Sequence, residues 1–211
     1  FYYRAAFSAK SRSHVVVYEN IKKSDNIIKN IGDLNEKTFA ENIFRVDLSS
    51  PTIRGWPPTP ESAYIVIDEP GYYELTSDIA VNSSYQVAIY IIANDVIFNG
   101  NGHILDGSNA GGEYGNVAIM VADVSNVTIA NTTIYNWDRD GIALKCVNNS
   151  VIKNNTIYNC EEGIAVYHTN SSLIVSNAIY NMEWSGIAFW SCEFDQVYNN
   201  TIINAYKGID I

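Results

Sequence analysis

Basic residues, prolines and long apolar runs are all scarce in this sequence. The shortage of basic residues argues against a nucleic-acid partner, and the lack of long apolar runs argues against a membrane span. The 211 residues carry 13 Lys and Arg against 23 Asp and Glu, a net charge of −10. Nucleic-acid binding needs a basic surface, so we expect no nucleic-acid partner. No apolar stretch approaches the roughly 20 residues that cross a bilayer, so we expect no membrane span in this segment. Hydrophobic residues still make up 47% of the chain, which is enough for a folded core.

Cysteine is scarce as well. The chain contains only Cys146, Cys160 and Cys192. Cys160 falls at a different place in the repeat from Cys146, and Cys192 lies two repeats from Cys146, about 9–10 Å away. We expect no intramolecular disulfide, because a bridge requires the two Cα atoms to approach within about 7 Å. There is also no Cys-x-x-Cys-His sequence, which excludes a c-type haem attachment site.

The few prolines gather in one place and divide the chain. Four of the five lie within residues 49–63, which we interpret as a Pro-rich linker. Residues 1–48 follow no repeat and predict an N-terminal cap or an interaction segment, with a strand at 14–18 and a helix at 35–44. Residues 64–211 consist of repeats.

Both ends of the chain look like internal points of a longer protein. The first residue is Phe1 and no signal peptide follows, as expected of a processed piece of a precursor. At the other end a further repeat begins at Gly208 and stops at Ile211. Repeat proteins usually end in a polar capping unit, so we expect the repeats to continue beyond Ile211.

A fixed period near 22 residues organises the repeats. Gly-Ile-Ala, or in the last copy Gly-Ile-Asp, begins at Gly141, Gly163, Gly186 and Gly208, at intervals of 22 or 23 residues. Between these copies, phrases of the type Asn-Asn-Thr-Ile-Tyr-Asn keep a register of their own. Such periodicity indicates stacked units, each of which buries its apolar edge against the next.

Each unit contains three short runs of β-forming residues bounded by Gly or Asn. In the unit that starts at Gly141 the runs are 142–144, 150–152 and 156–158. Alternation places apolar residues of each run inside, aligned with their copies in other units. The aligned columns are Ile142, Ile164, Ile187 and Ile209; Leu144, Val166 and Phe189; Ile152, Ile174 and Val197; and Ile134, Ile157, Ile179 and Ile202. Three strands per turn of about 22–24 residues predict an all-β fold, a single-stranded parallel β-helix.

Asparagine forms two further columns where the chain must turn. One contains Asn136, Asn159, Asn181 and Asn204, and the other contains Asn154, Ser176 and Asn199. Asparagine tolerates the left-handed backbone conformation, and its amide can bond to the copies above and below. We therefore expect both columns to stabilise corners of the β-helix.

The repeats resemble the right-handed β-helix repeats of the NosD-like and pectate-lyase-like superfamily. The likeness is carried by Gly71-Tyr-Tyr-Glu-Leu75, by the stretch from Asn94 to Gly107, by Ser125-Asn-Val-Thr-Ile129 and by the Gly-Ile-Ala units, and it covers residues 64–211. It implies a right-handed β-helix, of a form frequent in secreted or surface proteins of archaea. It implies no single activity, since the superfamily includes lyases, hydrolases, epimerases, a copper-site maturation protein and surface proteins.

Acidic residues gather just before the Gly-Ile-Ala strand. They are Asp138, Asp140, Glu161, Glu162 and Glu183. Successive turns lie about 4.8 Å apart, so these carboxylates line one edge. Such an edge can supply an acid and a base for polysaccharide cleavage, or oxygen ligands for Ca²⁺, and it can equally be a solvated corner. The chain has no Asp-Pro-His-Asp pattern like that of the superfamily's lyases and epimerases, so the resemblance assigns no catalytic residue.

Large side chains lie beside this acidic edge. Lys145, Tyr167 and Trp190 share one outward position, four residues after the glycine, and Trp184 lies near the same edge. Aromatic rings beside carboxylates suit stacking on sugar rings, and aromatic residues are also enriched at protein interfaces. We expect either a carbohydrate-binding face or an interface with a partner here.

Two weaker patterns complete the candidate sites. Cys146 and His168 lie five residues after their glycines and Cys192 lies six after, so the three side chains could hold a soft metal such as copper. Alternation puts the fifth position inside, where the alternative is an ordinary core column. Seven Asn-x-Ser/Thr triplets also occur. Those in turns between strands, our candidates for N-glycosylation, are Asn82, Asn148 and Asn170.

Several classes of function remain open. The sequence favours an extracellular or cell-surface structural protein, a rigid rod that associates with its own copies or other surface proteins in a layer or filament. The first alternative is a carbohydrate-active enzyme or polysaccharide-binding module working along the acidic edge. A copper-handling protein is the second alternative.

Overall fold

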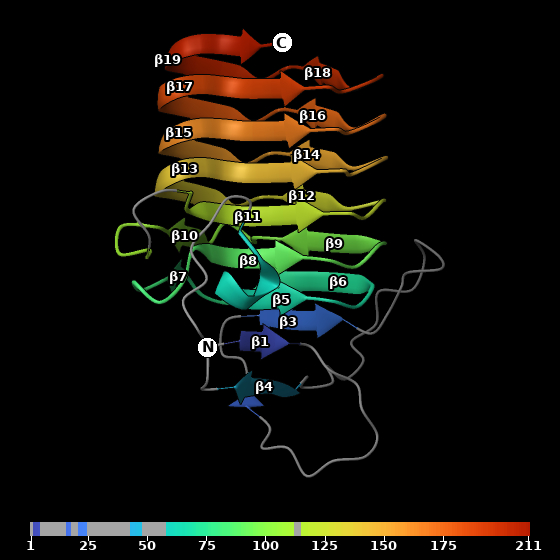
Figure 1. The fold of residues 1–211 in the computed structure, drawn as a ribbon, viewed down its shortest axis with the longest axis vertical. Coiled ribbons are helices and arrows are strands. Elements are labelled where there is room, and N and C mark those ends of the chain that lie inside the picture. Colours follow the sequence, from blue (N-terminus) through green and yellow to red (C-terminus); the bar gives the residue numbers. More distant parts are fainter. Residues whose placement is uncertain (1, 5–15, 18–20, 25–42, 48–57, 112–114) are drawn as a thin grey trace.

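The structure, a computed structural model, describes residues 2–4, 16–17, 21–24, 43–47, 58–111 and 115–211. In this part the chain winds into a stack of parallel strands, one turn above another (Figure 1). The predicted all-β parallel β-helix is therefore confirmed. Helix within the described part is confined to η1, a short 3₁₀ segment at Pro60–Ser62. None of the described helical residues belongs to a helix long and apolar enough to cross a membrane.

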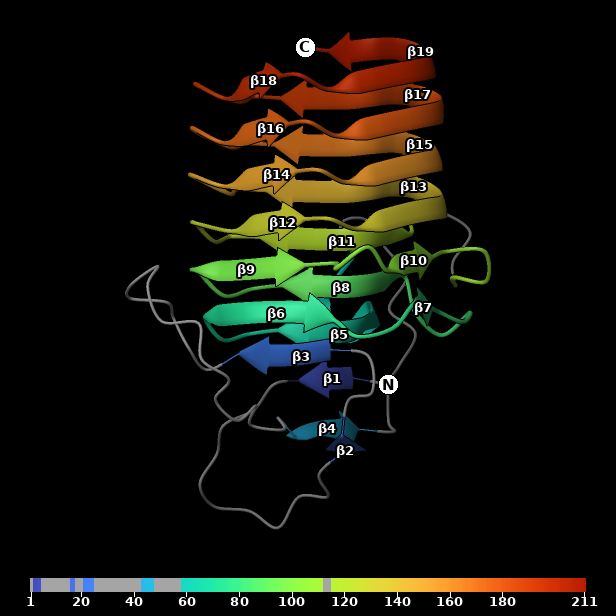
Figure 2. The same ribbon diagram turned by 180° about the vertical axis from the view of Figure 1, so that it is seen from behind.

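Three groups of strands succeed one another along the chain. The long sheet contains β5 (Ala63–Ile67), β8 (Val87–Ile91), β11 (Val117–Ala122), β13 (Thr133–Lys145), β15 (Thr156–Tyr167), β17 (Ala178–Trp190) and β19 (Thr201–Asp210). The second sheet, seen in Figure 2, contains β6 (Gly71–Leu75), β9 (Val96–Asn99), β12 (Thr128–Ala130), β14 (Val151–Lys153), β16 (Leu173–Val175) and β18 (Gln196–Tyr198). The third side begins as the short strands β7 (Ile79–Ala80) and β10 (Ile104–Asp106).

From β13 onward, the strand of the third side runs directly into the long sheet. β10 pairs with the first residues of β13, whereas β11 pairs with its last residues. A register shift between Trp137 and Asp140 separates the two halves. Such a bulge lets a strand change direction while its pairing continues on both sides. Two of the three predicted strands are thus joined into one bent strand in these turns.

The described N-terminal strands extend both sheets. β1 (Tyr2–Arg4) pairs in parallel with β5 and antiparallel with β4 (Ile43–Asp47), and β4 pairs with β2 (Val16–Val17). β3 (Ile21–Ser24) pairs antiparallel with β6. The first turn of the β-helix therefore has strand neighbours on its open side.

Two local expectations for this region can be compared with the described residues. The strand expected at 14–18 is described at Val16 and Val17, and its other residues lie outside the described part. The helix expected at 35–44 is wrong at its end, because Ile43 and Phe44 lie in β4; residues 35–42 lie outside the described part. Phe and Ile are strong β formers, and strand pairing with β1 outweighs their helix-like spacing.

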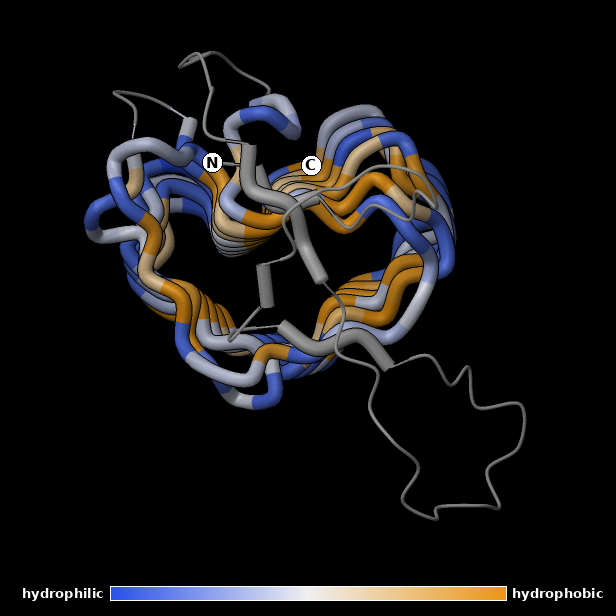
Figure 3. The backbone as a smooth tube through the Cα atoms, turned by 90° about the horizontal axis from the view of Figure 1, so that it is seen from below, coloured by the Kyte–Doolittle hydropathy of each residue, from blue (hydrophilic) through white to orange (hydrophobic). Residues whose placement is uncertain are grey.

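The repeated glycine is required by packing between turns. A Cβ atom built on Gly163 would lie 2.5 Å from the carbonyl oxygen of Gly186 and 2.7 Å from Cγ2 of Ile179. The following residues Ile142, Ile164 and Ile187 are fully buried in the core. Viewed along the axis, successive turns superpose on one closed outline (Figure 3). Only glycine leaves the neighbouring turn close enough for this superposition.

The exposed asparagine column takes its predicted place at a corner. Asn136, Asn159, Asn181 and Asn204 all adopt the left-handed conformation, with φ between 56° and 59°. Each amide from Asn159 onward donates to the Oδ1 of the copy in the preceding turn, at 3.1–3.4 Å. The second predicted column is also left-handed, and Asn199 Nδ2 donates to Ser176 Oγ at 2.9 Å.

A third asparagine column lies inside the β-helix and was not expected. Asn155 and Asn177 are buried, and Asn200 follows them in the next turn. The Oδ1 of Asn177 accepts from the backbone N and from Nδ2 of Asn155, both at 3.0 Å. Asn177 in turn donates from its own N and Nδ2 to Asn200 Oδ1. This buried ladder links the backbone of each turn to the side chain of the next.

We expect Asn177→Ala to destabilise the protein by about 2–4 kcal/mol. The substitution leaves the N–H of Asn155 and the carbonyl of Ile152 without their amide partner in a buried site, and each such loss costs about 1–3 kcal/mol. Urea unfolding followed by circular dichroism measures the change.

The control is Asn181→Gly, in the exposed ladder of the same turn. Glycine adopts the left-handed conformation freely, so this variant should lose less than about 1 kcal/mol. Equal losses for the two variants would contradict a special role for the buried ladder.

Candidate functional site

Two of the predicted acidic residues meet on the outer face of the long sheet. Asp140 on β13 is in register with Glu162 on β15, which is in register with Ser185 on β17. The core-facing neighbours of this position, such as Ile142 and Ile164, belong to the main hydrophobic cluster. We call Asp140, Glu162 and Ser185 the carboxylate row.

The carboxylate row is buried although it lies on the outer face. The relative exposure is 0% for Asp140, 6% for Glu162 and 0% for Ser185. Both carboxylate oxygens of Asp140, Oε2 of Glu162 and Oγ of Ser185 form no hydrogen bond with any described residue. Buried polar atoms in folded proteins are nearly always hydrogen-bonded, so a run of such atoms on adjacent strands is unusual.

Arg139 and Tyr167 close over the carboxylate row. Arg139 Nε lies 3.5 Å from Asp140 Oδ2, and Arg139 Nη2 donates a hydrogen bond of 3.3 Å to the Tyr167 hydroxyl. Arg139 comes from β13, directly before Asp140 in the sequence, and Tyr167 is the last residue of the neighbouring strand β15. We call their contact, which joins β13 to β15 next to the buried Asp140, the Arg139–Tyr167 bridge.

Burial dominates the electrostatics of the row. Loss of water raises the pKa of Asp140 well above its usual value, while Arg139 opposes the rise and Glu162 adds to it. Burial likewise raises the pKa of Glu162 to about 7, with Arg139 lowering it and the charges of Glu161 and Asp210 raising it. Desolvation and the charges of Asp140 and Glu162 raise the pKa of the Tyr167 hydroxyl, while the hydrogen bond with Arg139 lowers it. Two neighbouring acids of this kind hold at least one proton near neutral pH.

Polar residues missed by the sequence analysis lie one and two turns below Arg139. Val117 and Val87 are in register with Asp140, and Asn116 and Gln86 directly precede them, as Arg139 precedes Asp140. Asn116 is 3% exposed and Gln86 is 4% exposed. Asn116 Oδ1 and both amide atoms of Gln86 form no hydrogen bond with any described residue. The backbone of Asn116 is tied to the site, since its N donates to Asp138 Oδ1 at 2.8 Å. Comparing the residue three before each core isoleucine, Ile89, Ile119 and Ile142, would have found them.

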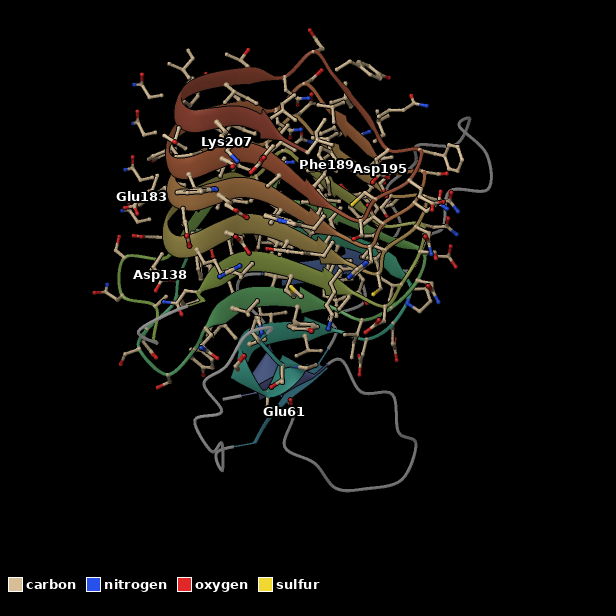
Figure 4. The ribbon with its side chains drawn as sticks, turned by 45° about the horizontal axis from the view of Figure 1, so that its top comes forward. Glu61, Asp138, Glu183, Phe189, Asp195 and Lys207 are labelled. Atoms are coloured by element: carbon tan, nitrogen blue, oxygen red, sulfur yellow. The ribbon has the colours of Figure 1, made fainter. Side chains whose placement is uncertain are left out.

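The other predicted acidic residues lie near the row but outside it. Asp138 and Glu183 are exposed, on the same side of the stack as Lys207 (Figure 4), and Glu161 is half-buried. Burial raises the pKa of Asp138, partly offset by its hydrogen bond from Asn116. The expected single column of carboxylates is therefore reduced to Asp140 and Glu162, because register shifts in β13 and β17 displace the others.

The predicted outward column of Lys145, Tyr167 and Trp190 is in register. The rings of Tyr167 and Trp190 stack with centroids 4.5 Å apart and planes 7° apart. On the other side of the row, Trp184 contacts Tyr206 with centroids 5.2 Å apart, and Lys207 Nζ lies 5.8 Å from the centre of a Trp184 ring. Aromatic side chains thus flank the carboxylate row on both sides.

The Cys-His pattern is not an inward column. Cys146 and His168 both adopt φ of 52° in turns, where Cys146 is half-buried and His168 is exposed. Turn geometry interrupts the strand alternation on which the inward expectation rested. Cys192 packs against the core and its thiol donates to the carbonyl of Val166 at 3.4 Å. Within the described part, no three His, Cys, Asp or Glu side chains are grouped to hold a metal ion.

The candidate glycosylation sites lie in turns. Asn82 and Asn148 are exposed and Asn170 is half-buried. Asn82 Oδ1 accepts from the backbone N of Ser84 at 2.9 Å, and Asn170 Oδ1 accepts from the hydroxyl of Ser171 at 2.6 Å. Asn148 is the most regular of the three, because its backbone bridges to Ser125 and Asn170 in the turns below and above.

Comparison with known proteins identifies the fold family. No curated protein matches the chain. Among solved structures, a candidate glycosyl hydrolase from Parabacteroides merdae ATCC 43184 is similar, with 15% identity, a TM-score of 0.43, and 68% of this chain and 82% of that chain covered. That likeness is too low to bear on function. Residues 77–211 match the family described as right-handed β-helix region, and with the parallel stack of turns this match establishes that the chain belongs to the right-handed β-helix family.

Proposed function

We propose that the protein binds a polysaccharide along the outer face of the long sheet and hydrolyses it with Asp140 and Glu162. One observation carries the proposal, namely that two buried carboxyl groups occupy paired positions on adjacent strands, and that both oxygens of Asp140 and Oε2 of Glu162 form no hydrogen bond with a described residue. A structural rod gains nothing from such a pair. Buried charges without full compensation cost stability, and strongly shifted acids concentrate at functional sites.

The geometry suits cleavage of a glycosidic bond. Paired strands place the Cα atoms of Asp140 and Glu162 about 4.8 Å apart. Hydrolases that retain the anomeric configuration use two carboxyl groups about 5–5.5 Å apart, one as an acid and the other as a nucleophile. Burial raises the pKa of both groups, so the pair keeps a proton, and in the proposed mechanism we assign it to Glu162 because Arg139 Nε lies 3.5 Å from Asp140 Oδ2.

These charges assign a role to each carboxyl group. Glu162 donates its proton to the leaving glycosidic oxygen, while Asp140 attacks the anomeric carbon and forms a glycosyl-enzyme ester. Water then attacks the same carbon, the ester bond breaks, and Glu162 takes the proton of the water. Because Asp140 is covered, the Arg139–Tyr167 bridge must open for substrate to enter, and the aromatic rings of Tyr167, Trp190 and Trp184 then flank the sugars.

A second proposal retains the surface role suggested by the sequence, with the protein outside the cell and glycosylated at Asn148. The outer face of the third side carries Tyr135, Tyr158, Tyr180 and Ile203 in register, and the rings of Tyr135 and Tyr158 stack at 5.0 Å. This regular apolar column suits contact between copies of the rod.

Sedimentation should then show that the wild type associates and that Tyr158→Glu abolishes the association. A monomeric wild type would contradict the proposed contact between copies.

Cleavage should depend on both carboxyl groups. We expect Glu162→Gln and Asp140→Asn each to lower the rate of reducing-end release from a cleaved polysaccharide by at least about 100-fold, the usual contribution of acid–base catalysis. Nuclear magnetic resonance of the first product should show a retained anomeric configuration.

The control for this experiment is Glu193→Gln, since Glu193 is exposed in a turn away from the row. It should keep the activity of the wild type. Polysaccharide cleavage that survives both row substitutions would rule out the assigned catalytic pair.

Removing the carboxyl group of Glu162 should also stabilise the fold at high pH. The folded protein holds this proton with a pKa of about 7, against 4.5 for the ordinary group. Its contribution to stability is therefore complete below about pH 4.5 and is lost as the pH rises through 7. Glu162→Gln should raise Tm at pH 8 by about 2–4 °C for each kcal/mol regained, and the gain should vanish near pH 4.5.

Calorimetry of the wild type, Glu162→Gln and Glu193→Gln across this pH range provides the measurement. The Glu193→Gln curve should follow the wild type at every pH. If Glu162→Gln does so too, Glu162 is not desolvated in the folded protein.

A further inference from the structure

We infer that the polysaccharide bound at the carboxylate row carries no carboxylate groups, and that its hydroxyl or amino groups donate hydrogen bonds to a strip of side chains running from Ser185 to Gln86. This inference rests on the proposed function and adds to it the class of substrate. Two independent features of the outer face support it, the hydrogen-bonding capacity of its buried atoms and the distribution of its charges.

The first feature is a continuous strip of polar atoms that lack partners among the described residues. Above Asp140 it contains Glu162 Oε2 and Ser185 Oγ, and below it contains Asn116 Oδ1 and the side-chain amide of Gln86. Every one of these side chains is at least nine-tenths buried. Because the strip crosses five neighbouring strands of one sheet, β8 to β17, it runs along the helix axis, and an extended ligand would contact it once the side chains that bury it move aside.

The chemistry of the strip requires a ligand that donates hydrogen bonds. Carboxylate and amide oxygens accept, and among the atoms of the strip only the Gln86 amide nitrogen, the Ser185 hydroxyl and a protonated carboxyl can donate. Sugar hydroxyl and amino groups supply the missing donors. A carboxylate on the sugar is an acceptor only, so it adds no donor for these oxygens.

The second feature is the surrounding charge. Asp138, Glu161 and Glu183 lie beside the row, as described above for the acidic edge. Two of the three nearby cations already face anions: Arg139 lies against Asp140, and Lys207 Nζ bonds to Asp210 Oδ2 at 2.8 Å, while the third, Lys145, is in register with Tyr167. A uronate polymer would bring a negative charge on every sugar against this edge, and like charges at an interface oppose binding.

The test compares three polymers under identical conditions, namely partially deacetylated chitin, a neutral β-glucan and polygalacturonate. Binding by affinity electrophoresis and cleavage by reducing-end release are measured for each. We expect binding and cleavage of the amino-sugar or the neutral polymer, and affinity for polygalacturonate at least about tenfold weaker. Polygalacturonate bound or cleaved as well as the others would overturn the inference on substrate class and leave the proposed hydrolysis standing.

Charge variants separate the electrostatic cause from other causes. Glu161→Lys combined with Glu183→Lys should raise affinity for polygalacturonate at least about tenfold in low salt, and added salt should remove the gain. Glu193→Lys makes the same change of charge at one position away from the row, and it should not raise the affinity for polygalacturonate. No gain in the double variant would overturn the inference, whereas failure of the wild type to bind any of the three polymers would overturn the proposed function itself.

Discussion

Hydrogen bonds from buried asparagine side chains to the next turn of the chain are the constraint on which the rest of the structure depends. Asn155, Asn177 and Asn200 satisfy backbone groups at a corner where the strands separate and cannot do so themselves. Each amide donates from Nδ2 to a backbone carbonyl of the preceding turn, so a slip of one residue would leave buried donors without acceptors. The ladder therefore fixes the register as well as contributing stability, and the glycine column lets the turns approach closely enough to use it.

A fixed register determines which outer residues become neighbours. Residues 22 apart in sequence, Asp140 and Glu162, are adjacent across β13 and β15, and Ser185 follows on β17. The same geometry aligns Tyr167 with Trp190 and lets Tyr167 reach Arg139. A solenoid thus assembles a local site from side chains on successive turns without any loop, and the rigidity of the core holds the acids in place.

The site lowers stability in a protein whose corners are built from hydrogen-bonded groups. Elsewhere the corners satisfy amide with amide, whereas the outer face keeps oxygens of Asp140 and Glu162 buried without hydrogen bonds from described residues. Natural proteins tolerate such costs chiefly where activity depends on them. That contrast, more than the acidity of the chain as a whole, is why the outer face of the long sheet stands out as the functional region.

The sequence by itself determined the stack of turns, the Ile columns, the glycine column and the exposed asparagine corners, because all of these repeat every 22 or 23 residues and obey strand alternation. It could not tell which asparagine of an Asn-Asn pair is buried, since periodicity does not give the direction of a side chain at a turn; Asn154 is exposed and Asn155 is inside. It placed Cys146 inside for the same reason. The sequence placed Asp140 and Glu162 correctly at one edge. It grouped Glu183 with them wrongly, because the register shifts in β13 and β17 arise only when the strands bend and pair. The burial of the two acids was decided by tertiary structure alone, since it depends on which side chains meet across turns, as Arg139 and Tyr167 do, and the free energy of a charge depends on what surrounds it.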